Sequence, residues 1–158
     1  RVSSTSRGLG DVYKRQSGDI FFTDPTYGFM NLSDWSFDES VKELDFSGVY
    51  KYSTESGIEL VSNELDLPNG LALSNDERYL YVNSSNMAEA PIILKIDLEN
   101  ENNSELFFDG TELANENPGN FDGLKVHSSG NIFTTGPNGI LVYLPMVNCW
   151  LILNLKIC

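Results

Sequence analysis

The feature that most constrains the fold is a repeat with spacings of 53 and 59 residues. Two segments, "LPNGLALSNDERYLYV" (67–82) and "NFDGLKVHSSGNIFTT" (120–135), share a polar residue, Gly, Leu, an apolar residue two positions on, a short polar turn and an apolar stretch. A third copy, "SGDIFFTDPTYG", aligns so that Ile20, Tyr79 and Ile132 correspond. Periods near 50 residues with four strands each are typical of β-propeller blades, which bury their faces only by stacking around an axis.

The sequence around these repeats predicts short strands and almost no helix. Segments rich in β-branched and aromatic residues alternate with Gly, Asn, Asp, Ser and Pro, which is the pattern of strands separated by turns. One complete blade is predicted between Asn69 and Phe108, in "GLALS", "RYLYVNSS", "PIILKIDL" and "SELFF". Residues 30–46 are expected to form a long loop with one helical turn. The predicted fold class is all-β, a partial β-propeller of about two to three four-stranded blades.

Both ends of the chain are interpreted as foreign to this domain. Within residues 1–16, "SRGLGDVYKRQ" shows no apolar periodicity and matches one reading frame of a transposon adapter used in sequencing libraries. Residues 146–158, "MVNCWLILNLKIC", lack acidic residues and are interpreted as frameshifted, because restoring one lost base after the Pro145 codon yields a turn followed by a strand start. The propeller domain is therefore assigned to residues 17–145, and both end segments are expected to pack poorly.

The charge of the chain excludes two classes of partner. Residues 17–145 contain 5 Lys or Arg and 22 Asp or Glu, a net charge of −17. Such a surface repels nucleic acid and anionic membranes and favours cations, although most of these charges are interpreted as a solvated coat. No apolar run approaches the roughly 20 residues that span a bilayer. The sequence indicates neither the localisation nor the oligomeric state.

The motifs resemble the senescence marker protein, gluconolactonase and luciferin-regenerating enzyme family. The resemblance rests on "SGDIFFTDPTYGF", "GVYKYS", "LPNGLALSNDERYLYV", "FFDG" and "NFDGLKVHSSGNIFTTGPNGILVY", and covers residues 17–143. It implies a six-bladed propeller with one divalent cation in the central tunnel, usually calcium, with zinc, magnesium or manganese as alternatives. It also implies that the intact parent hydrolyses a small-molecule lactone. The family includes phosphotriesterase-like members, so the fold does not fix the substrate.

By this resemblance, Asn69 and Asp122 fall on two of the family's metal ligands. A residue at the start of the innermost strand points to the propeller axis, so equivalent positions in successive blades converge. A hard cation accepts neutral or anionic oxygen ligands, and Asn and Asp supply one of each kind. The alternative is that the Asn-Gly and Asp-Gly pairs are only turn signals, because both tolerate positive φ. The shared register in two blades favours the ligand interpretation.

The resemblance also assigns roles within the expected site. Asp122 is implied to be the catalytic proton acceptor or donor, while Asn69 holds the cation and orients the substrate carbonyl. Asp24 and Tyr27, in "TDPTYG", are candidate substrate-binding residues near the tunnel mouth, although an Asp-Pro turn is the simpler explanation of this motif. His127 precedes a Ser-Ser-Gly turn and is interpreted as a surface-loop residue.

The expected ligand set is incomplete in this chain. Counting back from the third copy of the repeat places a further ligand at Gly10, inside the segment interpreted as adapter sequence. A Glu that the family supplies from an earlier blade has no counterpart. We therefore expect the fragment to bind the cation weakly and to be inactive by itself. The competing functions are a phosphotriesterase-like hydrolase with the same metal and a non-catalytic propeller that serves as a binding module.

Overall fold

Three antiparallel sheets follow one another along the chain. The computed structural model describes residues 12–15, 18–31, 33–34, 36–38, 40, 42–86, 90–100 and 102–153. Within these residues, each sheet has four strands, and strands consecutive in sequence pair with one another. The prediction of an all-β fold built from four-stranded blades is confirmed, with three blades present.

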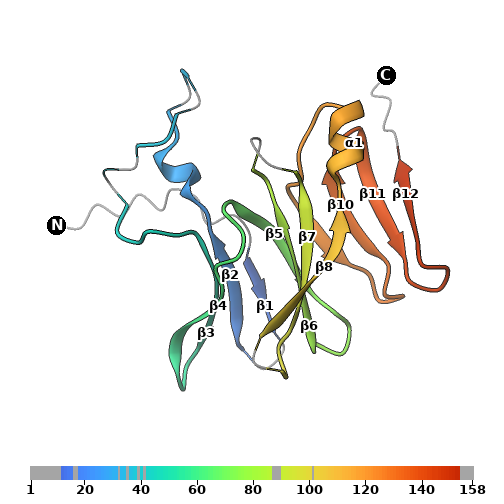
Figure 1. Cartoon of the computed structure of the whole chain (residues 1–158). Coiled ribbons are helices and arrows are strands. Elements are labelled where there is room, and N and C mark those ends of the chain that lie inside the picture. Colours follow the sequence, from blue (N-terminus) through green and yellow to red (C-terminus); the bar gives the residue numbers. More distant parts are fainter. Residues whose placement is uncertain are drawn as a thin grey trace.

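The three sheets are seen side by side in Figure 1, with colours running from blue at the first to red at the third. The first sheet contains β1 (Val12–Lys14), β2 (Ile20–Asp24), β3 (Gly48–Ser53) and β4 (Gly57–Ser62). The second contains β5 (Pro68–Leu73), β6 (Tyr79–Ser84), β7 (Ile92–Asp97) and β8 (Asn103–Asp109). The third contains β9 (Leu124–Val126), β10 (Ile132–Gly136), β11 (Gly139–Leu144) and β12 (Cys149–Leu153).

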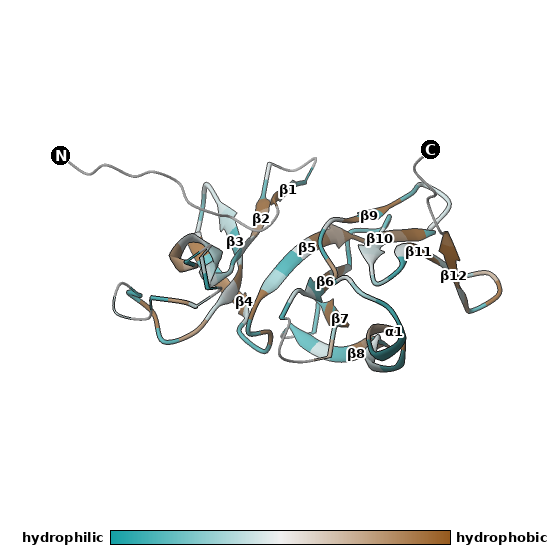
Figure 2. Ribbon diagram, turned by 90° about the horizontal axis from the view of Figure 1, so that it is seen from above, coloured by the Kyte–Doolittle hydropathy of each residue, from teal (hydrophilic) through white to brown (hydrophobic). Residues whose placement is uncertain are grey.

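The first strand of each sheet lies on the inner side of the arrangement. Viewed from above in Figure 2, the sheets fan outward, with β1, β5 and β9 closest to one another and β4, β8 and β12 at the outside. Strand β5 contacts β1 and β2 of the first sheet and β9 of the third. Equivalent positions in successive inner strands are therefore brought together, as stacked blades require.

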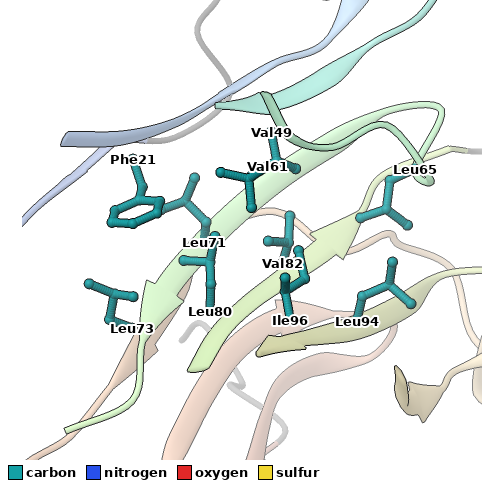
Figure 3. Close-up of a cluster of buried hydrophobic side chains, with 10 residues drawn as sticks. All are labelled: Phe21, Val49, Val61, Leu65, Leu71, Leu73, Leu80, Val82, Leu94 and Ile96. Atoms are coloured by element: carbon teal, nitrogen blue, oxygen red, sulfur yellow. The ribbon is translucent and has the colours of Figure 1, made fainter. Parts of the chain in front are cut away.

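The middle sheet is buried on both faces because side chains alternate along its strands. On β5, Leu71 and Leu73 join the cluster between the first and second sheets, whereas Ala72 joins the cluster between the second and third. Successive residues of a strand point to opposite faces, so the continuous apolar run serves both clusters. Figure 3 shows the first cluster, where Phe21 and Val49 from the first sheet meet Leu71 and other side chains of the second.

Two short helices were not predicted. The 3₁₀ helix η1 (Thr26–Phe29) lies just before the segment 30–46. Within that segment, where one helical turn was expected, Ser40 has 3₁₀ conformation. The α-helix α1 (Thr111–Glu116) was not predicted, because six residues are too few to show a helical period. No helix in the described part of the chain has the length and apolar character needed to span a bilayer.

The end segments contribute one strand each. β1 occupies the inner position of the first sheet and pairs with β2, while β12 forms the outer edge of the third. Tyr13 and Trp150 pack against the core clusters, which differs from the expectation of poor packing, whereas Val12 and Leu151 are exposed. Unpaired backbone groups at a sheet edge accept any adjacent segment with strand character. The foreign origin of residues 1–16 and 146–158 stays a prediction.

Candidate functional site

A pocket of about 450 Å³ lies where the second and third sheets begin. Asn69, the second residue of β5, and Asp122, two residues before β9, both line it. Its other polar lining residues are Tyr27, Ser85, Asn86 and Asn120, and its apolar wall consists of Met30, Phe37, Leu67 and Phe121. The two residues predicted to share a cation are thus brought to one cavity, although they are 53 positions apart in sequence.

The backbones of both candidate ligands are anchored in the same way. The hydroxyl Oγ1 of Thr23, on β2, donates to the carbonyl oxygen of Asn69 over 2.9 Å. The amide Nδ2 of Asn83, on β6, donates to the carbonyl oxygen of Asp122 over 2.8 Å. In each case a side chain from the second strand of one sheet holds the ligand-bearing segment of the next sheet. The two copies of the repeat are therefore equivalent in backbone hydrogen bonding as well as in the position of the candidate ligand side chain.

Asn83 connects the two segments directly. Its side chain is fully buried, and its Oδ1 accepts the backbone N–H of Gly70 over 2.8 Å. Its Nδ2 also donates to Oγ1 of Thr134, over 3.1 Å, in addition to Asp122. Because unpaired polar groups are unfavourable in a buried position, this set of bonds fixes how the second and third sheets meet.

Ser85 organises the wall of the pocket beside Asn69. Its hydroxyl accepts a hydrogen bond from Nδ2 of Asn69 over 3.0 Å and donates to the carbonyl oxygen of Phe121. Its own carbonyl oxygen accepts from Nδ2 of Asn120 over 2.7 Å. With the Asn69 nitrogen used in this way, the carbonyl oxygen Oδ1 is the Asn69 atom left for a ligand.

The interpretation of the Asn-Gly and Asp-Gly pairs as turns is wrong for this site. Neither Gly70 nor Gly123 has a positive φ, and Asn69 and Gly70 lie within β5. Gly70 is instead required by close approach, because a Cβ at this position would lie 2.0 Å from the carbonyl oxygen of Asp122. A Cβ at Gly123 would meet nothing within 4 Å.

Asn69 and Asp122 offer the oxygen ligands that a hard cation binds. Asn69 is half-buried and offers a carbonyl oxygen, while the exposed Asp122 offers a carboxylate, and calcium takes both types of ligand. No group of three or more His, Cys, Asp or Glu side chains suited to a metal occurs in the described ranges. Calcium takes six to eight oxygen ligands, so these two residues form part of a coordination shell. Gly10, where a further ligand is expected, lies outside the described residues.

The two candidate substrate-binding residues are placed differently. Tyr27, in η1, lines the pocket, and its hydroxyl is buried without a hydrogen-bond partner among the described residues. Burial raises the pKa of Tyr27. The nearby side chains of Ser85 and Asn69 lower this pKa, and the charges of Asp122 and Asp66 raise it further. Tyr27 therefore lies near the polar side chains of Ser85 and Asn69 that line the same pocket.

Asp24 ends β2 and is not among the residues that line the pocket. Partial burial raises the pKa of its carboxyl, and its charge contributes to the raised pKa of Tyr50, on β3. The structure therefore places Asp24 near Tyr50 and outside the lining of the pocket. His127 is exposed and bonds through Nδ1 to the hydroxyl of Ser129, as expected for a loop residue.

Residues 3–146 match the family described as the SMP-30/gluconolactonase/LRE-like region. The chain belongs to this family. A gluconolactonase from Zymomonas mobilis subsp. mobilis is 36% identical to it over 148 residues, covering 88% of this chain and 39% of that protein. The predicted family relationship is confirmed.

Solved structures of the family share the fold. A gluconolactonase from Xanthomonas campestris superimposes with a TM-score of 0.68 at 26% identity, covering 88% of this chain and 45% of that one. A luciferin-regenerating enzyme gives a TM-score of 0.62 at 18% identity, covering 90% of this chain and 44% of that one, and shows similarity of fold alone. The chain thus spans less than half the length of these relatives, and its three sheets correspond to part of their propeller.

Proposed function

We propose that this sequence is part of a metal-dependent hydrolase that opens sugar lactones in the manner of a gluconolactonase. The observation that carries the proposal is the convergence of Asn69 and Asp122 on one pocket, each held by a side chain of the preceding sheet. The relationship to gluconolactonases supports the substrate class. We use "full-length protein" for this sequence joined to the remaining blades of a ring of the relatives' length.

The cation proposed for the site is calcium, held by Oδ1 of Asn69 and the carboxylate of Asp122. The engagement of the Asn69 nitrogen with Ser85 supports this, because it leaves the oxygen for the ligand. When bound, such a cation supplies Lewis acidity that polarises an ester carbonyl and stabilises the developing oxyanion.

Asp122 has the second role of moving the proton during hydrolysis. Its carboxylate is exposed and can accept a proton from water as the water oxygen bonds to the carbonyl carbon. The same proton then passes to the ring oxygen as the carbon–oxygen bond of the ring breaks, giving the open hydroxy acid. Asn69 would orient the substrate carbonyl through the cation that it helps to hold.

The isolated chain is proposed to be inactive. Two side chains supply a minority of the oxygen ligands that calcium takes, and the described residues offer no acidic cluster to complete the shell. Cation binding by the isolated chain should accordingly be weak, and turnover should require the remaining blades.

The proposal is tested with the full-length protein, a panel of sugar lactones and one phosphotriester. Hydrolysis is followed by acid release with and without a chelator, with re-addition of calcium as the control. We expect lactone hydrolysis that the chelator abolishes and calcium restores. Hydrolysis of the phosphotriester alone would replace the substrate class, and hydrolysis of lactones that survives chelation would contradict the metal dependence.

A further inference from the structure

The Tyr27 hydroxyl is a buried group on a residue that lines the proposed site. Its oxygen atom makes no hydrogen bond of regular geometry among the described residues, although the side chains of Ser85 and Asn69 lie near enough to lower the pKa of Tyr27. Tyr27 lines the same pocket as Asn69 and Asp122. A buried hydroxyl that lacks its hydrogen bond destabilises the folded protein. Such a group at a pocket wall is therefore a candidate for bonding to whatever fills the pocket.

We infer that the Tyr27 hydroxyl donates a hydrogen bond to the carbonyl oxygen of a ring ester or ring amide bound in the pocket beside Asn69 and Asp122. This inference rests on the proposed function for its ligand class. It assigns Tyr27 the role of fixing the ligand carbonyl, and it excludes Asp24, which does not line the pocket.

The local fold holds Tyr27 in place. η1 follows directly after β2, and both Pro25 and Thr26 at its start are buried. The backbone N–H of Met30 donates to the carbonyl oxygen of Tyr27 over 3.1 Å, which closes the turn. The preceding strand is tied to the site by the bond from Thr23 to the carbonyl oxygen of Asn69. The ring is thus carried by a short element whose turn is closed by a hydrogen bond and whose preceding strand is bonded to Asn69.

Other donors of the pocket wall are already used within the protein. The amide nitrogens of Asn69 and Asn120 donate to Ser85, and the amide nitrogen of Asn86 donates to Asp66. The Ser85 hydroxyl donates to the carbonyl oxygen of Phe121. Tyr27 is therefore placed to supply the donor that a carbonyl oxygen requires, while Asp122 supplies an acceptor.

The protonation of Tyr27 agrees with a donor role. Burial raises its pKa above the ordinary value, and the carboxylates of Asp122 and Asp66 raise it further against the opposing effect of Ser85 and Asn69. A phenol with a raised pKa keeps its proton at neutral pH and does not act as a base there.

The test uses δ-valerolactam, a ring amide that carries the same carbonyl and resists hydrolysis. The 158-residue chain, labelled with ¹³C at Cζ of its tyrosines, is titrated with the lactam at millimolar calcium. Tyr27→Phe identifies the Tyr27 resonance and removes the donor. Tyr52→Phe, on β3 and 39% exposed, is the matched control.

We expect the Tyr27 resonance to shift on addition of lactam. We also expect lactam affinity to fall about two- to tenfold in Tyr27→Phe and to stay unchanged in Tyr52→Phe. A Tyr27 resonance that does not move, a chain that binds no lactam, or equal affinity in Tyr27→Phe would each overturn the inference. The wild-type shift does not depend on the folding of a variant. If the full-length protein failed to hydrolyse lactones while this shift occurred, the proposed function would fail and the donor assignment would stand.

Discussion

The tripeptide Pro-Asn-Gly occurs twice in this chain with two different structures. At residues 137–139 it links β10 to β11, and Asn138 and Gly139 have positive φ angles of 68° and 136°. At residues 68–70 it opens β5 with no positive φ, and Asn69 faces the pocket. The first copy therefore uses the conformational freedom of Asn and Gly, and the second uses Gly for its missing Cβ.

This difference shows that an Asn-Gly pair does not by itself distinguish a turn from a site. What separates the two copies is the neighbouring sheet. The backbone of Asp122 lies against Gly70, whereas Asn138 is exposed at the end of a hairpin. Exchanging residues at these positions should therefore have separable effects on activity and on stability.

The largest expected effect is on activity in the full-length protein. Asp122→Asn should lower lactone hydrolysis by about 10²- to 10⁴-fold, because it removes an anion from the cation site and the group assigned to proton transfer. Asn69→Asp adds charge and should retain cation binding while reducing Lewis acidity, a loss of about tenfold or less. Asn138→Asp is the control and should leave the rate unchanged. Retention of most activity by Asp122→Asn at saturating calcium would move the proton-transfer role to another residue.

The second effect concerns packing between the middle and third sheets. Gly70→Ala should lower the free energy of unfolding by about 3 kcal/mol or more, because the new Cβ would overlap the carbonyl oxygen of Asp122. Gly123→Ala should change it by less than about 0.5 kcal/mol, since space is open there and φ is not positive. Urea unfolding of the 158-residue chain measures both, and equal losses would show that the close approach does not control packing.

The third effect is that of removing the connection between the candidate ligands. Asn83→Ala should lower the free energy of unfolding by about 2–3 kcal/mol, because it leaves Gly70, Asp122 and Thr134 groups unpaired in a buried position. Asn75→Ala is the control, because Asn75 also bridges the second and third sheets but is exposed. Thermal unfolding of both variants would show no difference if the buried network contributed nothing beyond a surface contact.

The smallest effect belongs to the turn copy of the tripeptide. Asn138→Ala should destabilise the chain by about 1 kcal/mol, because Ala disfavours the left-handed conformation at φ 68°. Asn138→Gly should be tolerated, since Gly adopts this conformation readily. Circular dichroism melts of the two variants test the assignment, which would be wrong if Ala and Gly behaved alike.

The repeat was sufficient to predict the architecture and the meeting of Asn69 with Asp122. Strand alternation has a local signature, and the spacing between copies identifies equivalent positions in successive blades. The helix α1 was missed because its six residues carry no period, and β1 formed in a segment that had been assigned to adapter sequence.

The polar residues that support the site could not be predicted from their own sequence context. Thr23, Asn83 and Ser85 lie in or directly after strands rich in apolar residues, and their importance comes from partners in the next sheet. A buried Asn at such a position looks like any polar residue near a strand end until its partners are known. The hydrogen bonds from Thr23 to Asn69 and from Asn83 to Asp122 join neighbouring sheets, so they are seen only in the three-dimensional structure.

The central claim is that Asn69 and Asp122 bind one cation together. Isothermal titration of the full-length protein with calcium, using Asn69→Ala, Asp122→Ala and the double variant, tests it most directly. We predict that each single change weakens calcium binding strongly, that the double variant loses less than the sum of both losses, and that Asn138→Ala binds as the wild type does. Calcium affinity that is unchanged in either single variant would contradict the shared site.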